Sequence, residues 1–214
     1  MTQILFARHG ETEWNAVLRV QGWTDTPLSA RGRAQAAALA ERLAGLPLQA
    51  VYASDLSRAV ETAQPAAEKS GLEVQTLPGL RERRFGDWEG LTQADLERDH
   101  AAPWHRFHVR RDLDAPVPGG ETWAEVGARV RAALAHILAA HPGRDEAVLV
   151  VGHGGSGRTL LLEALQAPLT TLLCLHLDNA SVSRLHFRAP GDSRVSLLND
   201  TGHLDALGDA GESQ

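Results

Sequence analysis

Two histidines, far apart in the chain, each follow a short apolar run and precede a glycine. His9 stands in ARHGETEWN after the run ILF, and His153 stands in GHGG after the run AVLVV. Arg8 precedes the first histidine, and Arg58 lies in SDLSRAVETA. A neutral imidazole can attack phosphorus at pH 7 without a separate base, and guanidinium groups match phosphate oxygens. These residue types together indicate phosphoryl transfer, provided that the fold brings them to one place.

Such a reaction also requires a proton for the leaving alkoxide, so a carboxylic acid should stand nearby. Glu82 is the favoured candidate because it follows a predicted strand at the same edge of the sheet. The other acids considered are Glu11, Glu13, Asp55, Asp87 and Glu89. Gly154 would let a backbone N–H group approach an anion closely. Neither paired cysteines nor clustered carboxylates accompany the histidines, so we predict no metal and no cofactor.

The elements that must position these residues alternate between strands and helices. Apolar runs predict strands at 3–7, 49–54, 72–77 and 146–152, followed by two more within 171–188. Helical spacing predicts helices at 27–45, 55–71, 120–143 and 157–166. Ser54 or Asp55 is the expected cap of the second helix, and Pro65 is expected to break or kink it.

This alternation indicates an α/β domain with a mostly parallel sheet, whose ligands bind beyond the carboxyl ends of the strands. Residues 81–118 are less regular and are predicted to fold over one end of the sheet as a partly helical lid. We expect one domain over 1–205. The small, polar residues at 206–214 are predicted to form a disordered tail.

Composition narrows the possible partners. The chain has 214 residues and a net charge of −6, which gives no reason to expect nucleic acid or an acidic membrane as partner. No apolar run approaches the roughly 18 residues of a membrane helix, and the N-terminus does not resemble a signal peptide. Cys174 is the only cysteine and is expected in the core. A single cysteine cannot form an internal disulfide and is compatible with a reducing compartment, so we expect a cytoplasmic protein.

Five motifs in order carry a resemblance to a known family: RHGETEWN, SDLSRAVETA, LRERRFGDWEGLT, PGGET and GHGG. Together they resemble the histidine phosphatase superfamily, the phosphoglycerate-mutase-like proteins. The resemblance implies a three-layer α/β/α sandwich, whose mixed sheet is mostly parallel with an antiparallel edge strand. It also implies a reaction that needs no metal.

The resemblance implies a role for each matched residue. His9 is the nucleophile that becomes phosphorylated, and Glu82 is the general acid that later activates water. Three residues are implied to clamp the phosphate: Arg8, Arg58 and His153. The other residues implied to bind phosphate or substrate are Asn15, Gly154 and, at the rim of the pocket, Arg19.

Two features leave alternatives open. Arg110 and Arg111 could hold a second anionic group of the substrate, or they could form a solvated pair balanced by nearby aspartates. Ser156 and Gly157 follow GHGG where the family commonly carries a larger apolar residue. They are therefore expected to loosen the start of the following helix.

Only residues 91–117 separate WEG from PGGE, and so short a lid leaves the site open to water. We therefore predict a metal-independent phosphomonoester hydrolase, a histidine acid-type phosphatase that converts a small phosphorylated metabolite through a phosphohistidine. The alternative is a cofactor-dependent phosphoglycerate mutase, which must shield that intermediate from water. A non-catalytic binding protein on the same fold is less favoured. A monomer or a homodimer is expected.

Overall fold

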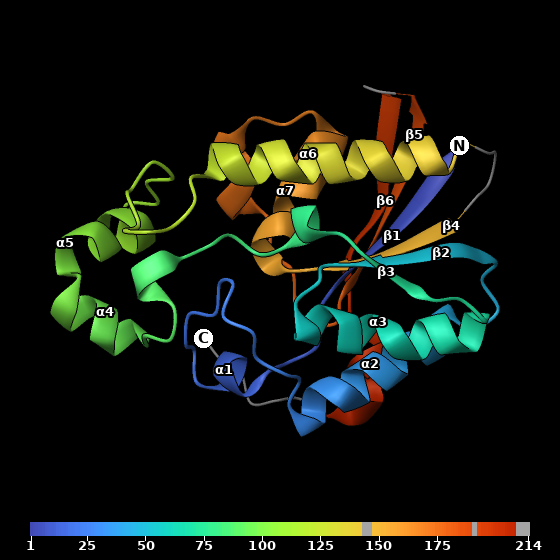
Figure 1. Ribbon diagram of the computed structural model, residues 1–214, viewed down its shortest axis with the longest axis horizontal. Coiled ribbons are helices and arrows are strands. Elements are labelled where there is room, and N and C mark those ends of the chain that lie inside the picture. The colour runs from blue at the N-terminus through green and yellow to red at the C-terminus, as the bar shows by residue number, and fades with distance from the viewer. Residues whose placement is uncertain (143–146, 190–191, 209–214) are drawn as a thin grey trace.

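Six strands form one sheet in the order β3-β2-β4-β1-β5-β6. The computed structural model describes residues 1–142, 147–189 and 192–208 (Figure 1). The strands are β1 (Thr2–Arg8), β2 (Leu48–Ala53), β3 (Val74–Thr76), β4 (Ala147–Gly152), β5 (Val182–Ala189) and β6 (Asp192–Asp200). Strands β1 to β4 are mutually parallel, whereas β5 pairs antiparallel with β1 and with β6. The predicted mixed, mostly parallel sheet is confirmed, but its reversed strand lies one position in from the edge.

Helices cover both faces of the sheet and so make the three predicted layers (Figure 1). The helices are α1 (Glu13–Ala16), α2 (Ala30–Leu43), α3 (Ser57–Ser70), α4 (Gln93–Asp99), α5 (Ala101–Trp104), α6 (Trp123–Ala140) and α7 (Gly154–Leu165). Helices α2 and α3 pack on one face, and α6 and α7 pack on the other. No helix among the described residues is long and apolar enough to cross a membrane.

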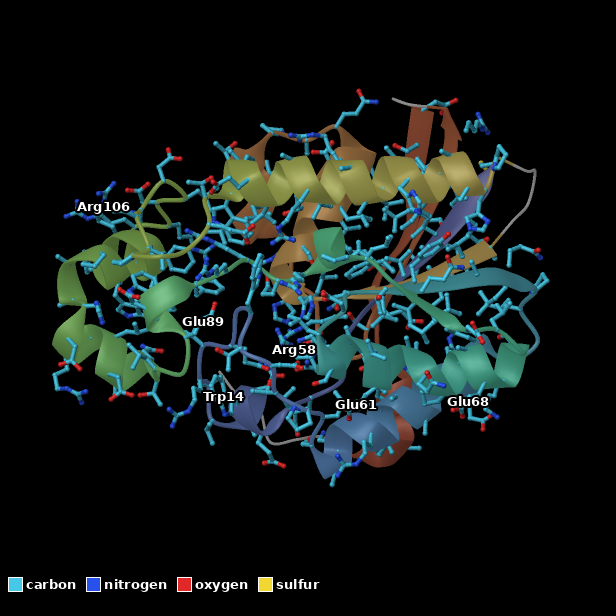
Figure 2. All side chains as sticks on the ribbon, viewed as in Figure 1. Trp14, Arg58, Glu61, Glu68, Glu89 and Arg106 are labelled. Atoms are coloured by element: carbon cyan, nitrogen blue, oxygen red, sulfur yellow. The ribbon has the colours of Figure 1, made fainter. Side chains whose placement is uncertain are left out.

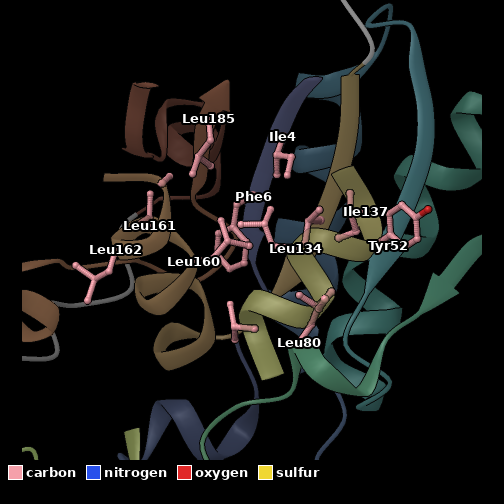
Figure 3. Close-up of a cluster of buried hydrophobic side chains, with 14 of the residues drawn as sticks. Ile4, Phe6, Tyr52, Leu80, Leu134, Ile137, Leu160, Leu161, Leu162 and Leu185 are labelled. Atoms are coloured by element: carbon pink, nitrogen blue, oxygen red, sulfur yellow. The ribbon is translucent and has the colours of Figure 1, made fainter. Parts of the chain in front are cut away.

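The central strand β1 shows how the sequence fills both layers. Ile4 and Phe6 belong to the cluster under α6 and α7 (Figure 3), and Leu5 and Ala7 belong to the cluster under α2 and α3. Successive side chains of a strand point to opposite faces, so this continuous apolar run serves both cores. The strand that carries the first histidine is therefore fixed from both sides.

Gly157 is needed because Phe6 occupies the space beside it. A Cβ at this position would lie 2.3 Å from Cε1 of Phe6, inside any real carbon contact. The helix begins at Gly154, and the Ser156 hydroxyl accepts a hydrogen bond from the His153 N–H at 3.2 Å. The expectation that Gly157 loosens the start of the helix is therefore wrong. Its role is to leave space for the Phe6 ring.

We expect Gly157→Ala to lower the free energy of unfolding by about 1–3 kcal/mol, because the added methyl overpacks the core. Gly127 in α6 is a matched control, since its Cβ would meet Arg131 only at 3.5 Å. Gly127→Ala is expected to stabilise the protein by about 0.4–1 kcal/mol through the unfolded chain. Urea unfolding of both variants measures the difference, and equal effects would contradict the packing role.

Helix α3 differs from its prediction at two points. It runs through Pro65 without a break, and this proline lies on a half-exposed side where water can replace the lost backbone bond. Its N-cap is Leu56, without a side-chain hydrogen bond, rather than Ser54 or Asp55. Asp55 is instead paired with Arg81, at 2.5 Å between Oδ2 and Nη2.

The lid has its own small core at one end of the sheet (Figure 1). Helices α4 and α5 and one π-helical turn, His105–Val109, make it partly helical. Trp88 is fully buried beside Leu96, and Trp104 and Phe107 pack against this pair. Trp88 thus forms the centre of this lid core.

Two C-terminal segments also differ from prediction. Leu169–Cys174 forms a 3₁₀ helix rather than a strand, and Cys174 is exposed rather than in the core. A further 3₁₀ helix, Gly202–Leu207, includes the start of the predicted tail, and Gly208 accepts a hydrogen bond from Arg31 at 2.7 Å. These residues are ordered against α2, while 209–214 lie outside the described residues.

Candidate active site

The pairing of β1 with β4 brings the two histidines together. Arg8 stands opposite Gly152 in this parallel pair, so His9 and His153 are the next residues on neighbouring strands. Their ring centroids lie 5.1 Å apart with an interplanar angle of 59°. His9 is 3% exposed and His153 is fully buried. The two predicted histidines therefore meet at the carboxyl edge of the sheet.

Within the described part of the chain, one of the two ring nitrogens of His9 forms a hydrogen bond. Its Nδ1 lies 2.7 Å from the carbonyl oxygen of Gly10, which can only accept a hydrogen bond, so Nδ1 carries the proton. Burial, and next the charges of Arg58 and Arg8, holds the pKa of His9 well below its usual 6.5. The imidazole is therefore neutral at pH 7, and its Nε2 lone pair is available to attack.

The backbone around His9 is fixed by side chains from distant elements. Thr62 of α3 accepts a hydrogen bond from the Gly10 N–H at 2.9 Å. Asn179 donates to the His9 carbonyl oxygen at 2.9 Å and lies 3.5 Å from Oδ1 of Asn15. The Asn15 Oδ1 also accepts from the backbone of Thr12 at 3.1 Å, and no described residue occupies the Asn15 amide nitrogen, which is therefore available to a ligand.

The two histidines make stability depend on pH. Burial, followed by the charge of Arg58, also keeps the pKa of His153 well below 6.5. As pH falls below 6.5 the unfolded chain gains protons that the folded protein does not bind. The free energy of unfolding is therefore expected to fall by up to about 1.4 kcal/mol per pH unit for each histidine.

Chemical unfolding at pH 7.5 and 5.0, in buffers free of phosphate, measures this loss. His153→Gln is expected to reduce the loss by roughly 1–2 kcal/mol relative to the wild type, because one of the two neutral groups is gone. If the wild type and the variant lost equal stability over this range, His153 would not be held neutral.

Arg8 and Arg58 flank the histidine pair. Arg8 donates to the Leu177 carbonyl at 2.6 Å, and Arg58 donates to the carbonyls of Gly22 at 2.7 Å and Thr24 at 3.0 Å. The Nε groups of both arginines are buried and have no hydrogen-bond partner within the described part of the chain. Both N–H groups are therefore suited to donate to the oxygens of an anion.

Residues 22–24, which hold Arg58, are themselves fixed by Glu89. Its carboxylate accepts backbone N–H bonds from Trp23 at 3.0 Å and Thr24 at 2.9 Å. Gly22 has a φ of +57°, and a Cβ there would lie 2.2 Å from Oε1 of Glu89. Glu89, considered above as an acid, thus shapes the loop that positions the arginine.

Glu82 reaches the site from the segment after β3. Its carboxylate accepts from the Gly155 N–H at 2.9 Å and from the Arg83 N–H at 2.7 Å. A Cβ on Gly154 would lie 3.8 Å from Oε2 of Glu82 and 3.7 Å from Nε of Arg8. Of the six acids considered from the sequence, Glu82 is the one that lines the cavity of His9 within the described residues.

These side chains surround one cavity of about 220 Å³. Figure 2 shows Arg58 at the end of α3 that faces the lid. The polar and charged side chains that line it are Arg8, His9, Asn15, Arg19, Gln21, Arg58 and Glu82. Aromatic residues of the lid form the opposite wall: Phe85, Trp88, Trp104 and Phe107. One wall can therefore bind phosphate, while the other meets the remainder of an ester.

The remaining predicted residues lie at or beyond the rim. Arg19 donates to the Gly90 carbonyl and lies over the Trp14 ring at 5.7 Å. Arg110 and Arg111 are exposed, and neither lines the cavity of His9. Arg111 instead lines a neighbouring cavity.

Sequence reasoning missed several residues that shape the site. Gln21 lines the cavity and accepts hydrogen bonds from Thr12 and Thr26 at 3.0 and 2.6 Å. Its place two residues after Arg19, in RVQGW, is the available sequence signal. Asn179 follows an apolar run as His9 does, but it falls in the predicted turn between two strands.

No group of three or more histidine, cysteine, aspartate or glutamate side chains is arranged to hold a metal ion within 1–142, 147–189 and 192–208. The donors at the site are instead guanidinium, imidazole and amide groups, which suit an anion.

Comparisons with known proteins agree with this geometry. Residues 4–201 match the model of the histidine phosphatase superfamily (branch 1). The chain is 38% identical over 204 residues to glucosyl-3-phosphoglycerate phosphatase of Mycobacterium tuberculosis, covering 91% of this chain and 90% of the relative. It is 37% identical over 210 residues to the probable phosphoglycerate mutase GpmB of an Enterobacter species, covering 96% of each.

A similar solved structure is that of a phosphoserine phosphatase mutant from Entamoeba histolytica in complex with phosphoserine. The TM-score is 0.81 at 29% identity, and the match covers 95% of this chain and all of that one.

Proposed function

Because the chain belongs to the histidine phosphatase superfamily, we propose that it hydrolyses a small phosphomonoester through a phosphohistidine formed on His9. The observation that carries this proposal is the free Nε2 of a neutral, buried His9 between two arginines with unsatisfied N–H groups. Hydrolysis of phosphoric monoesters is the activity of its phosphatase relatives, and it needs the groups that this cavity holds.

The reaction runs in two displacements at phosphorus. Nε2 of His9 forms a bond to phosphorus as the ester P–O bond breaks, and Glu82 in its acid form gives a proton to the departing alkoxide. Arg8, Arg58 and neutral His153 stabilise the charge on the transferring group. Water deprotonated by Glu82 then attacks the phosphohistidine, which releases inorganic phosphate and restores His9.

We further propose that the substrate is the phosphate ester of a small hydroxy acid. Three relatives are named for glucosyl-3-phosphoglycerate, phosphoserine and phosphoglycerate, and each of these compounds carries a carboxylate near the phosphate.

We also propose that the protein is located in the cytoplasm and is a monomer or homodimer. A chain with a single cysteine forms no internal disulfide and therefore needs no oxidising compartment. Light scattering measures the mass of the protein in solution and so distinguishes the monomer from the homodimer.

A panel of phosphomonoesters tests the function. We expect phosphate release from 3-phosphoglycerate and phosphoserine without any metal, and an acid-labile, base-stable phosphoenzyme in quenched reactions. The same samples, with and without a bisphosphate primer, test the mutase activity that one relative's name suggests. Strong primer-dependent isomerisation with little phosphate release would overturn the hydrolase proposal.

A further inference from the structure

A second cavity of about 290 Å³ lies beside the cavity of His9 and shares Phe107 with it. Arg158 of α7 and Arg111 of the lid line it, together with His108 and His176. Neither the nucleophile nor the phosphate clamp uses these side chains. The two guanidinium groups in this lining are suited to an anion.

Arg158 lines the second cavity and is bound to the backbone near the site of His9. Its side chain turns back toward the start of α7, where Nε donates to the Gly154 carbonyl at 3.1 Å. Gly154 itself is next to Arg8 and Glu82, since a Cβ added to it would lie within 4 Å of both side chains. The charge of Arg158 also acts on Arg8 and lowers the pKa of that guanidinium, after the larger effect of burial. The two guanidinium groups therefore lie within electrostatic range of each other.

The acids near Arg158 are engaged elsewhere. Glu82 accepts two backbone N–H bonds, and Asp178 is bound to His176 at 2.9 Å and to Asn199 at 2.7 Å. Among the described residues, no carboxylate forms an ion pair with Arg158.

Arg111 likewise has no acidic partner in the described part of the chain, and its Nη1 reaches only the Leu173 carbonyl at 3.3 Å. A half-buried guanidinium and an exposed one thus face the same cavity, and neither forms an ion pair within the described residues. Burial lowers the pKa of Arg158, and the charge of Glu82 opposes this effect.

We propose that Arg158, assisted by Arg111, binds the carboxylate of the substrate while His9 attacks the phosphorus. This inference rests on the proposed function for the identity of the ester. In 3-phosphoglycerate two carbons separate the carboxylate from the ester oxygen, so two adjoining anion sites suit it. Arg158 offers its two Nη groups as a fork that matches a carboxylate.

Binding to a full-length protein that cannot turn over tests the inference. In a His9→Ala background, calorimetry compares 3-phosphoglycerate with glycerol 3-phosphate, which has a hydroxymethyl group in place of the carboxylate. We expect preference for 3-phosphoglycerate. Arg158→Gln should reduce the ratio of the two affinities by roughly 10- to 100-fold, the usual value of a hydrogen bond to a charged group. Arg158→Lys should keep part of the ratio.

Arg131→Gln is the matched control, because Arg131 of α6 pairs with Glu163 of α7 at 2.6 Å, away from both cavities. Its ratio should equal that of the parent. Equal weakening of both ligands by Arg158→Gln would assign Arg158 to the phosphate site and overturn the inference. A His9→Ala parent that binds 3-phosphoglycerate no more tightly than glycerol 3-phosphate would also overturn it. Wild-type protein that binds with this preference but releases no phosphate would overturn the proposed function and leave the carboxylate site supported.

Discussion

His9→Asn is expected to abolish turnover, with a loss of roughly 10⁴- to 10⁶-fold in kcat, the range seen when a covalent nucleophile is removed. Asparagine can still donate to the Gly10 carbonyl that now binds Nδ1, so the local backbone should persist. It has no nitrogen lone pair that could attack phosphorus. Steady-state hydrolysis of p-nitrophenyl phosphate measures the loss of turnover. Acid-stability analysis of enzyme labelled by a phosphorylated substrate measures the loss of the phosphohistidine.

His136 provides the control for this substitution. It is exposed on α6 and contacts the Tyr52 ring at 6.4 Å, far from the lid. His136→Asn should keep both turnover and label. A His9→Asn protein with normal turnover, or with label transferred to His153, would show that a different nitrogen is the nucleophile.

Glu82→Gln is expected to act selectively on esters with poor leaving groups. For an alkyl phosphate, kcat/KM should fall by about 10²- to 10⁴-fold, because the alkoxide leaves without its proton. For p-nitrophenyl phosphate the fall should be under about tenfold, since nitrophenolate is a stable anion. Since kcat/KM reports the steps up to the first irreversible one, the second role of Glu82 in activating water does not disturb the comparison.

The comparison needs a check on structure, since the Glu82 carboxylate also accepts the Gly155 and Arg83 N–H bonds. Thermal unfolding should show that the variant is folded, and Glu97→Gln, an exposed change on the lid helix α4, should leave both rates unchanged. Equal losses on both esters would mean that Glu82 binds or positions the phosphate rather than protonating the leaving group.

The sequence was sufficient to predict that the two histidines meet, because one rule of parallel sheets determines it. His9 and His153 each follow a continuous apolar strand, and parallel neighbours end at the same edge. Where the structure disagreed, tertiary contacts had outweighed local preference. Residues 169–174 are apolar enough for a strand, but the place beside β1 in the sheet is taken by β5. The segment instead forms a 3₁₀ helix that packs on α7.

The supporting residues could not be predicted in the same way. Glu89 binds the N–H of a residue 66 positions earlier, and Asn179 binds a carbonyl 170 positions earlier. No local spacing encodes such contacts between loops. Arg158 was overlooked because an arginine on the first turns of a helix is ordinarily solvated, and only the fold shows which cavity it faces.

The separate core of the lid has a consequence for how this protein can change over time. Trp88 and Leu96 bury their surface among lid residues, apart from the two clusters that hold the sheet. Mutations that reshape the wall facing the ester need not weaken the strands that carry His9 and His153. The lid wall of the cavity can therefore change, in evolution or in a selected library, while the sheet edge that holds His9 and His153 stays constant.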